Sequence, residues 1–445
     1  MTAASLPPSV EVFAARRRRF VEAIGAAVAV LPNAPVAFRT SDAEYPYRPD
    51  SDFYYLTGLA EPHAVALLAP ADPQGGFVLF VRPRDRQEEV WTGPRVGVEG
   101  ALGDYGADRA YPVGELWQRL ADYLSGAERV YYVFGKDASL DGRMIELLRA
   151  SWAERARRGL ALPAFLDPRN IVHEARLVKG PEELALMRRA AAIAAEAHRR
   201  AMAAARAGMS EYEIEALVLH AFRSQGAAGP SYPPIVASGP SAAILHYSRN
   251  CRRMQAGELL LLDAGCEYEF YASDISRTFP VSGRFTALQR ELYDLVLAAQ
   301  TAAIAAIRPG APLEAVHDAA VRVLAEGLSR LGLLPGTAAQ IVESGSYRAY
   351  YTHRTSHWLG MDVHDVGRYR VDGNSRRLAP GMVLTVEPGL YFAADDATVP
   401  QPLRGIGIRI EDDVAVTENG AEVLTAEAPK SAAEIEALCA GGAAR

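Results

Sequence analysis

The sequence predicts an α/β (α+β) protein of two domains, residues 1–175 and 176–445. A chain of 445 residues is longer than one small domain usually is. Apolar runs bounded by proline and glycine alternate with segments of helical spacing, which is typical of mixed strands and helices. Pro163 and Pro168 limit helix continuation and predict a linker around residues 162–168.

The N-terminal domain is predicted to mix strands and helices. Residues 64–68 and 77–81 have the pattern of buried strands, and residues 116–124 and 144–156 have helical spacing. A basic run at 16–19 precedes the apolar run 20–31, an order that also occurs in secretory and twin-arginine signals. Because Glu22 interrupts the apolar run, we expect instead a surface helix that leads into a buried strand near residues 36–39.

The composition and net charge indicate which kinds of binding partner can be expected. Hydrophobic residues make up 49% and charged residues 23%, an ordinary globular balance. The net charge of -7 is a poor match for nucleic acid or an anionic membrane, and no apolar run is long enough to span a bilayer. Three cysteines cannot build a disulfide framework. We therefore expect a cytoplasmic protein with no nucleic-acid or membrane partner.

The C-terminal domain is predicted to pack helices on a sheet that contains hairpins. Pro181 followed by two acids favours a helix start, and that helix should run to about residue 206. Capping-box patterns at 210–213 and 286–289 start two further helices. The predicted strands are residues 259–262, 271–278, 383–386, 407–410 and 413–416.

Five positions of this domain place an acid or a histidine at the end of an apolar segment. Asp263 follows four leucines, and a hairpin would return Asp274 beside it. Glu387 and Glu411 follow apolar strands, and His357 precedes Trp358-Leu359. A buried carboxylate is costly unless something neutralises it, so these residues are candidates for a shared site.

Four carboxylates brought together repel one another, and divalent cations relieve this repulsion. Hard oxygen ligands with one nitrogen favour Mn²⁺, and two ions that share carboxylates can hold a hydroxide at neutral pH. Metal-assisted hydrolysis is therefore the predicted chemistry. Taken singly, each acid also suits a helix cap or an ion pair, and His357 also suits a hydrogen-bonded core histidine. The series of five favours the metal site.

These five residues, with their neighbours, resemble the metal-ligand pattern of the pita-bread metallopeptidases, which include methionine aminopeptidase, prolidase and aminopeptidase P. Residues 41–48, 51–58, 244–247, 262–268 and 383–391 are similar to bacterial aminopeptidase P in particular. The similarity covers nearly the whole chain. It implies an aminopeptidase P-type domain at 1–175 and a pita-bread catalytic domain at 176–445.

The resemblance implies a role for each metal-site residue. Asp263 would bind one metal ion, and His357 and Glu387 would bind the other. Asp274 and Glu411 would bridge both ions. Glu387 would also carry a proton between the hydroxide and the leaving nitrogen, a task that hydrolysis requires.

The resemblance also implies residues around the substrate. His364 would donate to the scissile carbonyl oxygen, with His246 nearby. His353 would line a pocket for proline. Arg409 would orient carboxylates of the metal site, and Tyr391 would contact the substrate, although a core position explains Tyr391 equally well.

Asp42 and Trp91 match positions that reach the active site of a neighbouring subunit in the family, which implies a dimer or tetramer. A core position is the open alternative for Trp91. Arg354 stands where the family commonly has a small residue, and we expect it to alter substrate selectivity without affecting metal binding. Asp412 and Asp413 are expected in a solvated turn.

The predicted function is that of an Xaa-Pro aminopeptidase, a two-metal enzyme that uses a metal-bridging hydroxide to release the first residue from peptides with proline second. The amide before proline has no N–H, so an enzyme cannot recognise this bond through that group. A pocket for the proline ring and a metal-bound hydroxide do not need it. Prolidase, which cuts Xaa-Pro dipeptides, shares all five ligands; the N-terminal matches favour aminopeptidase P. A non-catalytic peptide-binding protein of this fold is disfavoured because all five ligands are present.

Overall fold

The computed structural model describes residues 8–442, and the chain divides into two compact units between Ala175 and Arg176. Both units combine helices with sheets, which confirms the α/β class. No helix within residues 8–442 is both long and apolar enough to cross a membrane.

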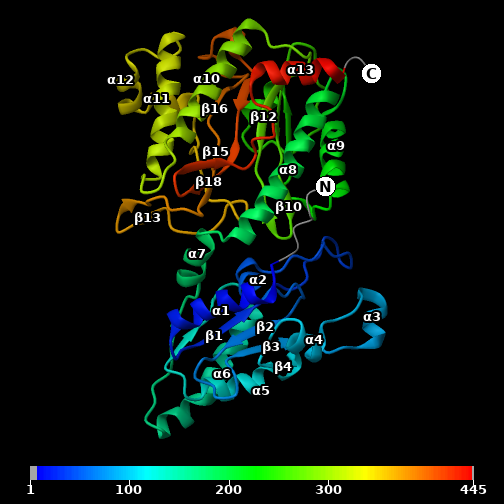
Figure 1. The fold of residues 1–445 in the computed structure, drawn as a ribbon, viewed down its shortest axis with the longest axis vertical. Coiled ribbons are helices and arrows are strands. Elements are labelled where there is room, and N and C mark those ends of the chain that lie inside the picture. Colours follow the sequence, from blue (N-terminus) through cyan, green and yellow to red (C-terminus); the bar gives the residue numbers. More distant parts are fainter. Residues whose placement is uncertain (1–7, 443–445) are drawn as a thin grey trace. The chain divides into compact units, whose positions relative to one another are not determined.

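The N-terminal unit is built on one mixed sheet with the strand order β4-β3-β2-β1-β5-β6 (Figure 1). The central pairs β1–β2 and β2–β3 are antiparallel, and the outer pairs are parallel. The strands are β1 (Val28–Pro32), β2 (Val65–Leu68), β3 (Phe77–Val81), β4 (Arg109–Pro112), β5 (Arg129–Tyr131) and β6 (Ala164–Leu166).

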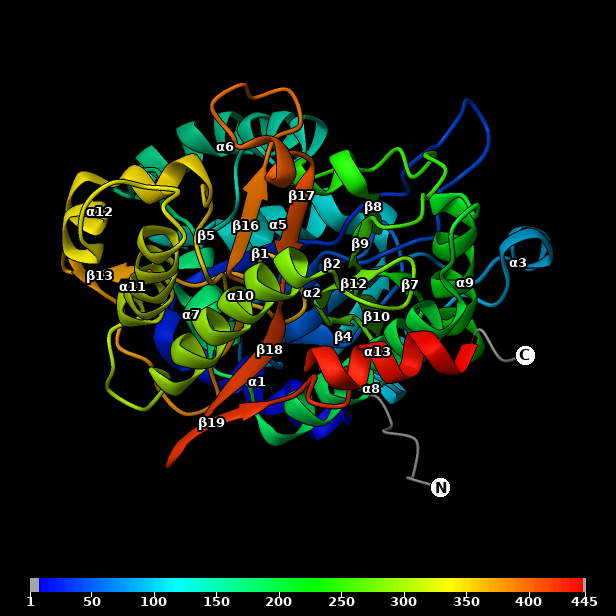
Figure 2. The same ribbon diagram turned by 90° about the horizontal axis from the view of Figure 1, so that it is seen from above.

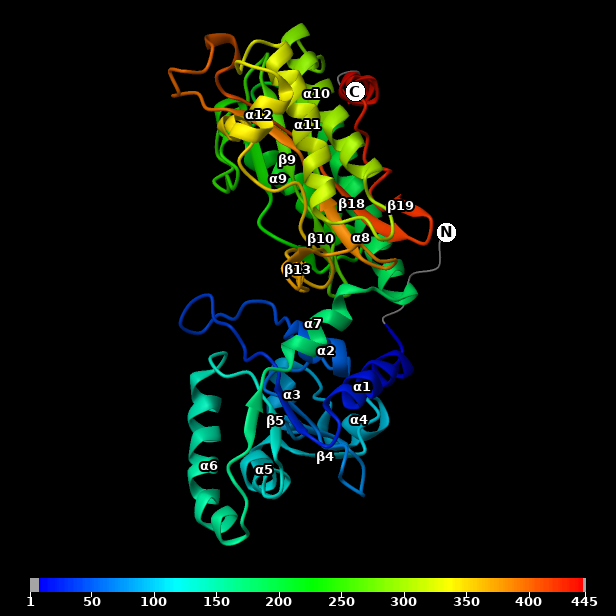
Figure 3. The same cartoon turned by 90° about the vertical axis from the view of Figure 1, so that its left-hand side faces the viewer.

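Helices cover both faces of this sheet. Leu120 and Met144, on α5 and α6, are fully buried against Val30, Leu67 and Phe80 of the strands. Figure 3 shows α5 and α6 on one side of the sheet and α1 on the other. The helices are α1 (Val10–Ile24), α2 (Ser51–Thr57), α3 (Arg86–Thr92), α4 (Gly97–Gly103), α5 (Leu116–Leu124), α6 (Ala138–Arg157) and α7 (Arg169–Leu177).

The structure corrects two predictions for this unit. The buried strand after the first helix is β1 at Val28–Pro32, not residues 36–39, because Gly25 ends α1 with a positive φ of 63° and the apolar run after it enters the sheet. The predicted linker at 162–168 contains the edge strand β6, which pairs with β5. The predictions for β2, β3 and α5 are confirmed.

The C-terminal unit places hairpins between two groups of helices. Helices α8 and α9 pack on the side of β8, β10 and β11, whereas α10 packs against β15, β16 and β17 and carries α11 with it (Figure 1). Both predicted capping boxes, at Ser210 and Thr286, are present. The helices are α8 (Pro181–Ala204), α9 (Glu211–Ser224), α10 (Ala287–Ala305), α11 (Glu314–Arg330), α12 (Ala338–Ser344) and α13 (Ala432–Gly442).

The strands of this unit form antiparallel pairs. Strand β9 pairs with β12 so that Asp263 lies opposite Ser276, which confirms the predicted hairpin. Strands β16 and β17 run side by side (Figure 2). The strands are β7 (Gly229–Pro230), β8 (Ile235–Ser238), β9 (Leu259–Asp263), β10 (Cys266–Tyr268), β11 (Tyr271–Ala272), β12 (Ser276–Pro280), β13 (Arg370–Val371), β14 (Asn374–Ser375), β15 (Val383–Val386), β16 (Gly389–Phe392), β17 (Ile406–Arg409), β18 (Asp412–Thr417) and β19 (Gly420–Val423).

The prediction of a solvated turn at Asp412 and Asp413 is wrong. Both residues are buried at the start of β18, with exposed fractions of 0% and 1%. Asp412 pairs with the fully buried Arg277 at 2.7 Å and with Lys430 at 2.6 Å. Removing one partner of such a pair would leave an uncompensated buried charge, so this cluster holds β12, β18 and the C-terminal segment together.

Candidate metal centre

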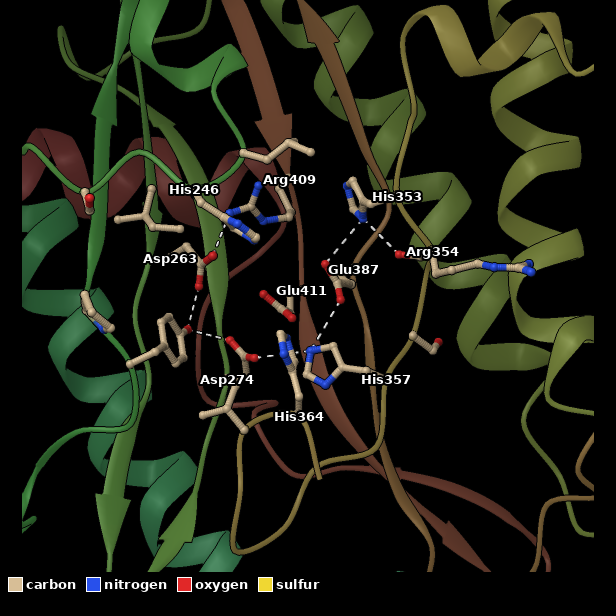
Figure 4. Close-up of a pocket in the computed structure, with 17 residues that line it drawn as sticks. His246, Asp263, Asp274, His353, Arg354, His357, His364, Glu387, Arg409 and Glu411 are labelled. Atoms are coloured by element: carbon tan, nitrogen blue, oxygen red, sulfur yellow. Dashed lines mark hydrogen bonds and ion pairs between the residues drawn. The ribbon is translucent and has the colours of Figure 1, made fainter. Parts of the chain in front are cut away.

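A cavity of about 510 Å³ in the C-terminal unit contains all five predicted metal ligands (Figure 4). Three further histidines, two arginines, two serines, a tyrosine and apolar side chains form the rest of its wall. The residues are Tyr232, Pro233, Ile235, Leu245, His246, Ser248, Asp263, Asp274, His353, Arg354, Ser356, His357, Val363, His364, Glu387, Arg409 and Glu411.

The hairpin architecture delivers the acids to this cavity from strand ends. Asp263 is the last residue of β9, and Asp274 lies in the break between β11 and β12. Glu387 and Glu411 lie in the two-residue links β15–β16 and β17–β18. The loop that carries His357 runs along β15, because the Thr385 N–H donates to the carbonyl of His357 at 2.9 Å.

The ligand atoms converge most closely at Asp274, His357 and Glu411. One atom of each lies within 4.8 Å of the others. The Nε2 atom of His357 is 3.5 Å from Asp274 Oδ2 and 3.5 Å from Glu387 Oε1. Its Nδ1 atom is 3.0 Å from the carbonyl oxygen of Trp358, a contact that fixes the ring with Nε2 facing the acids.

Asp263 is held by neighbours on the other side of the cavity. Arg409 Nη2 donates to Asp263 Oδ2 at 2.6 Å, and the Tyr232 hydroxyl lies 2.5 Å from Asp263 Oδ1. The same hydroxyl contacts Asp274 Oδ1, so Tyr232 links two of the predicted ligands. Sequence analysis missed Tyr232, which lies 31 residues before Asp263 with no pattern that connects them.

Burial and mutual repulsion perturb the acids strongly. Burial, together with the neighbouring carboxylates, raises the pKa of Asp274 and raises the pKa of Glu411 well above its ordinary value. Burial raises the pKa of Glu387 to about 7, although His357 and Arg409 oppose it. Burial alone would lower the pKa of His357, but Asp274 and Glu387 outweigh it and raise this pKa to about 9.

This donor set suits divalent cations. Of four clustered carboxylates, only Asp263 has an arginine as an ion-pair partner within the described residues. Burial is the largest cause of the raised pKa values of Asp274, Glu387 and Glu411, and neighbouring carboxylates add to it; bound cations would stabilise the ionised forms. Carboxylate oxygens and one imidazole are ligands that hard or borderline divalent ions accept.

Two further histidines line the cavity beside the acids. The His364 ring lies edge-on to His357 with 4.5 Å between ring centroids, and burial followed by repulsion from His357 lowers the pKa of His364. His246 lies in the exposed loop after the 3₁₀ turn Gly239–Ala243. Both rings therefore face the same space as the four acids and His357 (Figure 4).

His353 belongs to a chain of hydrogen bonds that ends at Asp263. Its Nε2 atom is 2.8 Å from the Tyr391 hydroxyl, which Arg409 Nη1 contacts at 3.1 Å. Burial, and then the charge of Arg409, lower the pKa of His353 to about 4, so the ring is neutral at neutral pH. Tyr391 is buried and is not part of the cavity wall; it holds His353 and Arg409 from behind.

His317 of α11 supports the same loop, although the sequence assigned it no role. Its Nδ1 atom is 2.8 Å from the hydroxyl of Thr355, which the Tyr351 hydroxyl also contacts at 2.6 Å. Thr355 is fully buried between His353 and His357. No local signal pairs a helix residue with a loop 38 positions later, so only the tertiary structure reveals this contact.

Asp42 and Trp91 belong to the N-terminal unit and do not line the cavity. Asp42 is exposed, and Trp91 on α3 keeps 85% of its surface exposed. A core position for Trp91 is therefore wrong.

Comparisons with known proteins agree with the two-part organisation. Residues 185–418 match the model of Metallopeptidase family M24, and residues 13–132 match that of the aminopeptidase P N-terminal domain. The Xaa-Pro aminopeptidase of Escherichia coli K12 is 47% identical over 97% of this chain and 98% of its own length. Xaa-Pro aminopeptidase 1 of Streptomyces coelicolor is 38% identical over 92% of this chain and 82% of its own.

Solved structures give the same result at the level of the fold. Pseudomonas aeruginosa aminopeptidase PepP matches with a TM-score of 0.96 at 47% identity, covering 99% of this chain and 100% of that one. Zinc-substituted E. coli aminopeptidase P in complex with product matches with a TM-score of 0.94 at 45% identity, covering 98% and 99%. The predicted resemblance and the predicted fold are both confirmed.

Proposed function

The chain belongs to metallopeptidase family M24, and from this membership we propose that it is an Xaa-Pro aminopeptidase, a hydrolase that releases the first residue from peptides whose second residue is proline. One observation carries the proposal: the four acids and one histidine predicted from the sequence as metal ligands line a single cavity. Relatives with this activity in their names cover nearly the whole chain, the N-terminal unit included.

We propose that two divalent ions occupy this cavity and that both are Mn²⁺. Asp274 and Glu411 would hold both ions, Asp263 one, and His357 with Glu387 the other. The close approach of Asp274, His357 and Glu411 supports this assignment, as does the excess of buried negative charge. When bound, the ions would polarise the peptide carbonyl and supply a hydroxide at neutral pH.

The chain's own residues would orient the peptide and move the proton. Glu387, whose carboxylate lies between His353 and His357 at the cavity wall, is suited to accept a proton and return it to the leaving nitrogen. His364 would donate a hydrogen bond to the scissile carbonyl oxygen, with His246 beside it. His353, fixed by Tyr391 and Arg409, would line the proline pocket.

A tripeptide and a dipeptide that both have proline as the second residue test the activity. With Mn²⁺ present, the tripeptide Arg-Pro-Pro should lose its first residue faster than the dipeptide Gly-Pro is cleaved. Glu387→Gln should lower kcat by roughly 10²- to 10⁴-fold, the range for a lost acid–base group. Glu422→Gln removes an acid paired with Arg188 on the surface and should leave kcat unchanged.

Three results would contradict the proposal. Strong hydrolysis of Gly-Pro with no cleavage of Arg-Pro-Pro would identify a prolidase. No hydrolysis of either peptide in the metal-loaded protein would favour a peptide-binding protein without catalysis. Full activity after exhaustive chelation would exclude the metal mechanism.

We also propose that the chain forms a homodimer or homotetramer in which Asp42 and Trp91 reach a neighbouring subunit's active site. The exposure of Trp91 at 85%, with Val90 beside it at 78%, supports an apolar contact surface. Trp91→Ala should lower activity or the solution mass, whereas Trp152→Ala, a matched exposed tryptophan, should change neither. A monomer, or undiminished activity in Trp91→Ala, would refute this role.

We propose a cytoplasmic location. All three cysteines are free thiols, and Cys251 is exposed, which supports a reducing compartment. Recovery of the protein from a periplasmic or secreted fraction with a cleaved N-terminus would contradict this location.

A further inference from the structure

A second cavity of about 360 Å³ adjoins the metal centre, and we call it the side pocket. It shares Arg354, Ser356 and His357 with the metal-site cavity, so the two spaces meet along one loop. The proposed catalytic roles leave the side pocket unused. Its residues are Leu313, Glu314, His317, Arg354, Thr355, Ser356, His357, Tyr369, Arg370 and Ser375.

The side pocket is positively charged, in contrast to the metal centre. Arg370 is balanced by its ion pair with Glu314. His317 is neutral at neutral pH, because burial and the charges of Arg354 and Arg348 lower its pKa to about 4. Arg354 therefore has no ion-pair partner among the residues that line the side pocket; Asp318, outside this lining, interacts with its charge without forming an ion pair.

Arg354 has a free side chain in this pocket. Within the part of the chain that the structure describes, its guanidinium makes no hydrogen bond or ion pair, and only its backbone carbonyl is engaged, by His353 Nδ1 at 2.8 Å. Figure 4 shows the side chain directed away from the carboxylates of the metal centre. A guanidinium presents a planar set of donors that matches a carboxylate, so an unpaired one beside an active site is a candidate anion binder.

Ser356 provides a second polar group at the boundary of the two cavities. Its hydroxyl oxygen is buried and has no hydrogen-bond partner among residues 8–442. An unsatisfied buried hydroxyl is costly, and a bound ligand that accepts a hydrogen bond would remove that cost. The side pocket thus offers one cation and one free donor to the same ligand.

We propose that the side pocket binds a carboxylate of the peptide substrate, with Arg354 as its ion-pair partner and Ser356 as a hydrogen-bond donor. The inference rests on the proposed peptidase function and names the substrate class that the site prefers. Two sources share this chemistry: the acidic side chain of the first residue, and a carboxylate on the residues after proline. In either case the peptide spans both cavities, with its scissile bond at the metal centre.

Amidated peptide pairs that differ only in charge test the proposal and identify the source. The pairs are Glu-Pro-Ala-amide against Gln-Pro-Ala-amide, and Ala-Pro-Glu-amide against Ala-Pro-Gln-amide, with Ala-Pro-Ala as free acid against its amide as a third pair. In the pair that carries the recognised carboxylate, kcat/KM should be roughly fivefold higher for the charged peptide, which is the upper range for an exposed ion pair. The difference should arise mainly from a lower KM. Arg354→Gln should bring that ratio close to one, and Ser356→Ala should reduce it.

Arg330→Gln is the matched control, since it removes a positive charge at the end of α11 outside both cavities and should keep the ratio. The proposal is overturned if the native protein shows no preference for a carboxylate in any pair, or if Arg354→Gln keeps the preference. Failure of the proposed peptidase function is a different result: no cleavage of the neutral peptides by any variant.

Discussion

At the scale of single residues, Tyr232 shows how the chain controls carboxylates that it has brought together. Its hydroxyl lies between Asp263 and Asp274, and burial together with these two acids raises its own pKa well above the ordinary value. The phenol therefore keeps its proton and can only share it with the carboxylates. Such partners orient metal ligands before the ion arrives.

Tyr232→Phe should weaken metal binding roughly 10- to 100-fold, as the loss of a group that orients a ligand usually does. Competition with a chelator would measure the change, and kcat at saturating metal should fall less than the affinity. Tyr293→Phe is the control: its hydroxyl donates to the Lys430 carbonyl at 2.7 Å, and the residue does not line the cavity. Equal metal affinity in the native protein and Tyr232→Phe would rule out this role.

The site residues that could be predicted from the sequence stand at recognisable local positions, whereas the other site residues do not. Asp263, Glu387 and Glu411 could be found because an acid directly after an apolar strand is unexpected without a partner. Tyr232 and His317 act across 31 and 38 positions through hydroxyl contacts, and no spacing rule joins such residues.

At the scale of elements, the turn between β9 and β10 sets the distance between the strands that carry Asp263 and Asp274. A Cβ atom at Gly265 would lie 1.7 Å from the Ser273 carbonyl oxygen, which is an impossible contact. The Gly265 carbonyl also accepts from the Ser231 N–H at 3.0 Å, next to Tyr232. Only a residue without a side chain allows this close approach.

Gly265→Ala should destabilise the protein by about 1–3 kcal/mol, the usual cost of overpacking, because the Ser273 backbone has to move. Since Ser273 precedes Asp274, metal affinity should fall as well. Denaturant unfolding and metal titration would measure the two effects. Gly229→Ala, on the neighbouring strand β7, has open space for a Cβ and should change neither quantity. An unchanged unfolding midpoint in Gly265→Ala would refute the argument.

Helices and strands that are marked by a capping box or an apolar run could be predicted from the sequence. Those whose bounds depend on tertiary contacts could not. Capping boxes and apolar runs identified α9, α10, β3 and β15 within a few residues. The expected strand 271–278 is broken around Asp274, because this residue leaves the ladder to face the cavity. The edge strand β6 lies between two prolines and depends on pairing with β5 and on the packing of Phe165 against the core.

At the scale of the whole molecule, the C-terminal unit contains two buried acidic clusters that respond to pH in opposite directions. Burial would raise the pKa of Asp412, but Arg277 and Lys430 overcome it and lower this pKa to about 2. At the metal centre, burial outweighs His357 and Arg409 and raises the pKa of Glu387, and Asp274 with Glu387 outweighs burial and raises the pKa of His357. The stability of the metal-free protein therefore depends on bound protons at the metal centre and on ion pairs at the Asp412 cluster.

The sign of each contribution follows from the direction of its pKa shift. A pKa of Asp412 that is lower in the folded chain adds stability above the ordinary value of 3.8, and this is lost as the pH falls toward 2. Raised values for Glu387 and His357 mean that the folded metal-free protein holds protons more tightly than the unfolded chain does. Their contribution is complete below about pH 4.5 for Glu387 and 6.5 for His357, and it is lost as the pH rises through about 7 and about 9.

These signs predict that the Tm of the metal-free protein falls as the pH rises from about 7 to about 9. In this window Asp412 stays ionised, and the buried histidines with a pKa of about 4, such as His317 and His353, stay neutral in both states. Mn²⁺ should raise the Tm by an increment that grows over the same window, because metal binding displaces the protons that His357 and Glu387 hold. Thermal unfolding with chelator and with Mn²⁺ would measure both slopes. Glu387→Gln, which cannot ionise, should show a shallower slope without metal. A Tm of the metal-free protein that rises with pH, or a metal increment that shrinks, would contradict the charge excess inferred for this site.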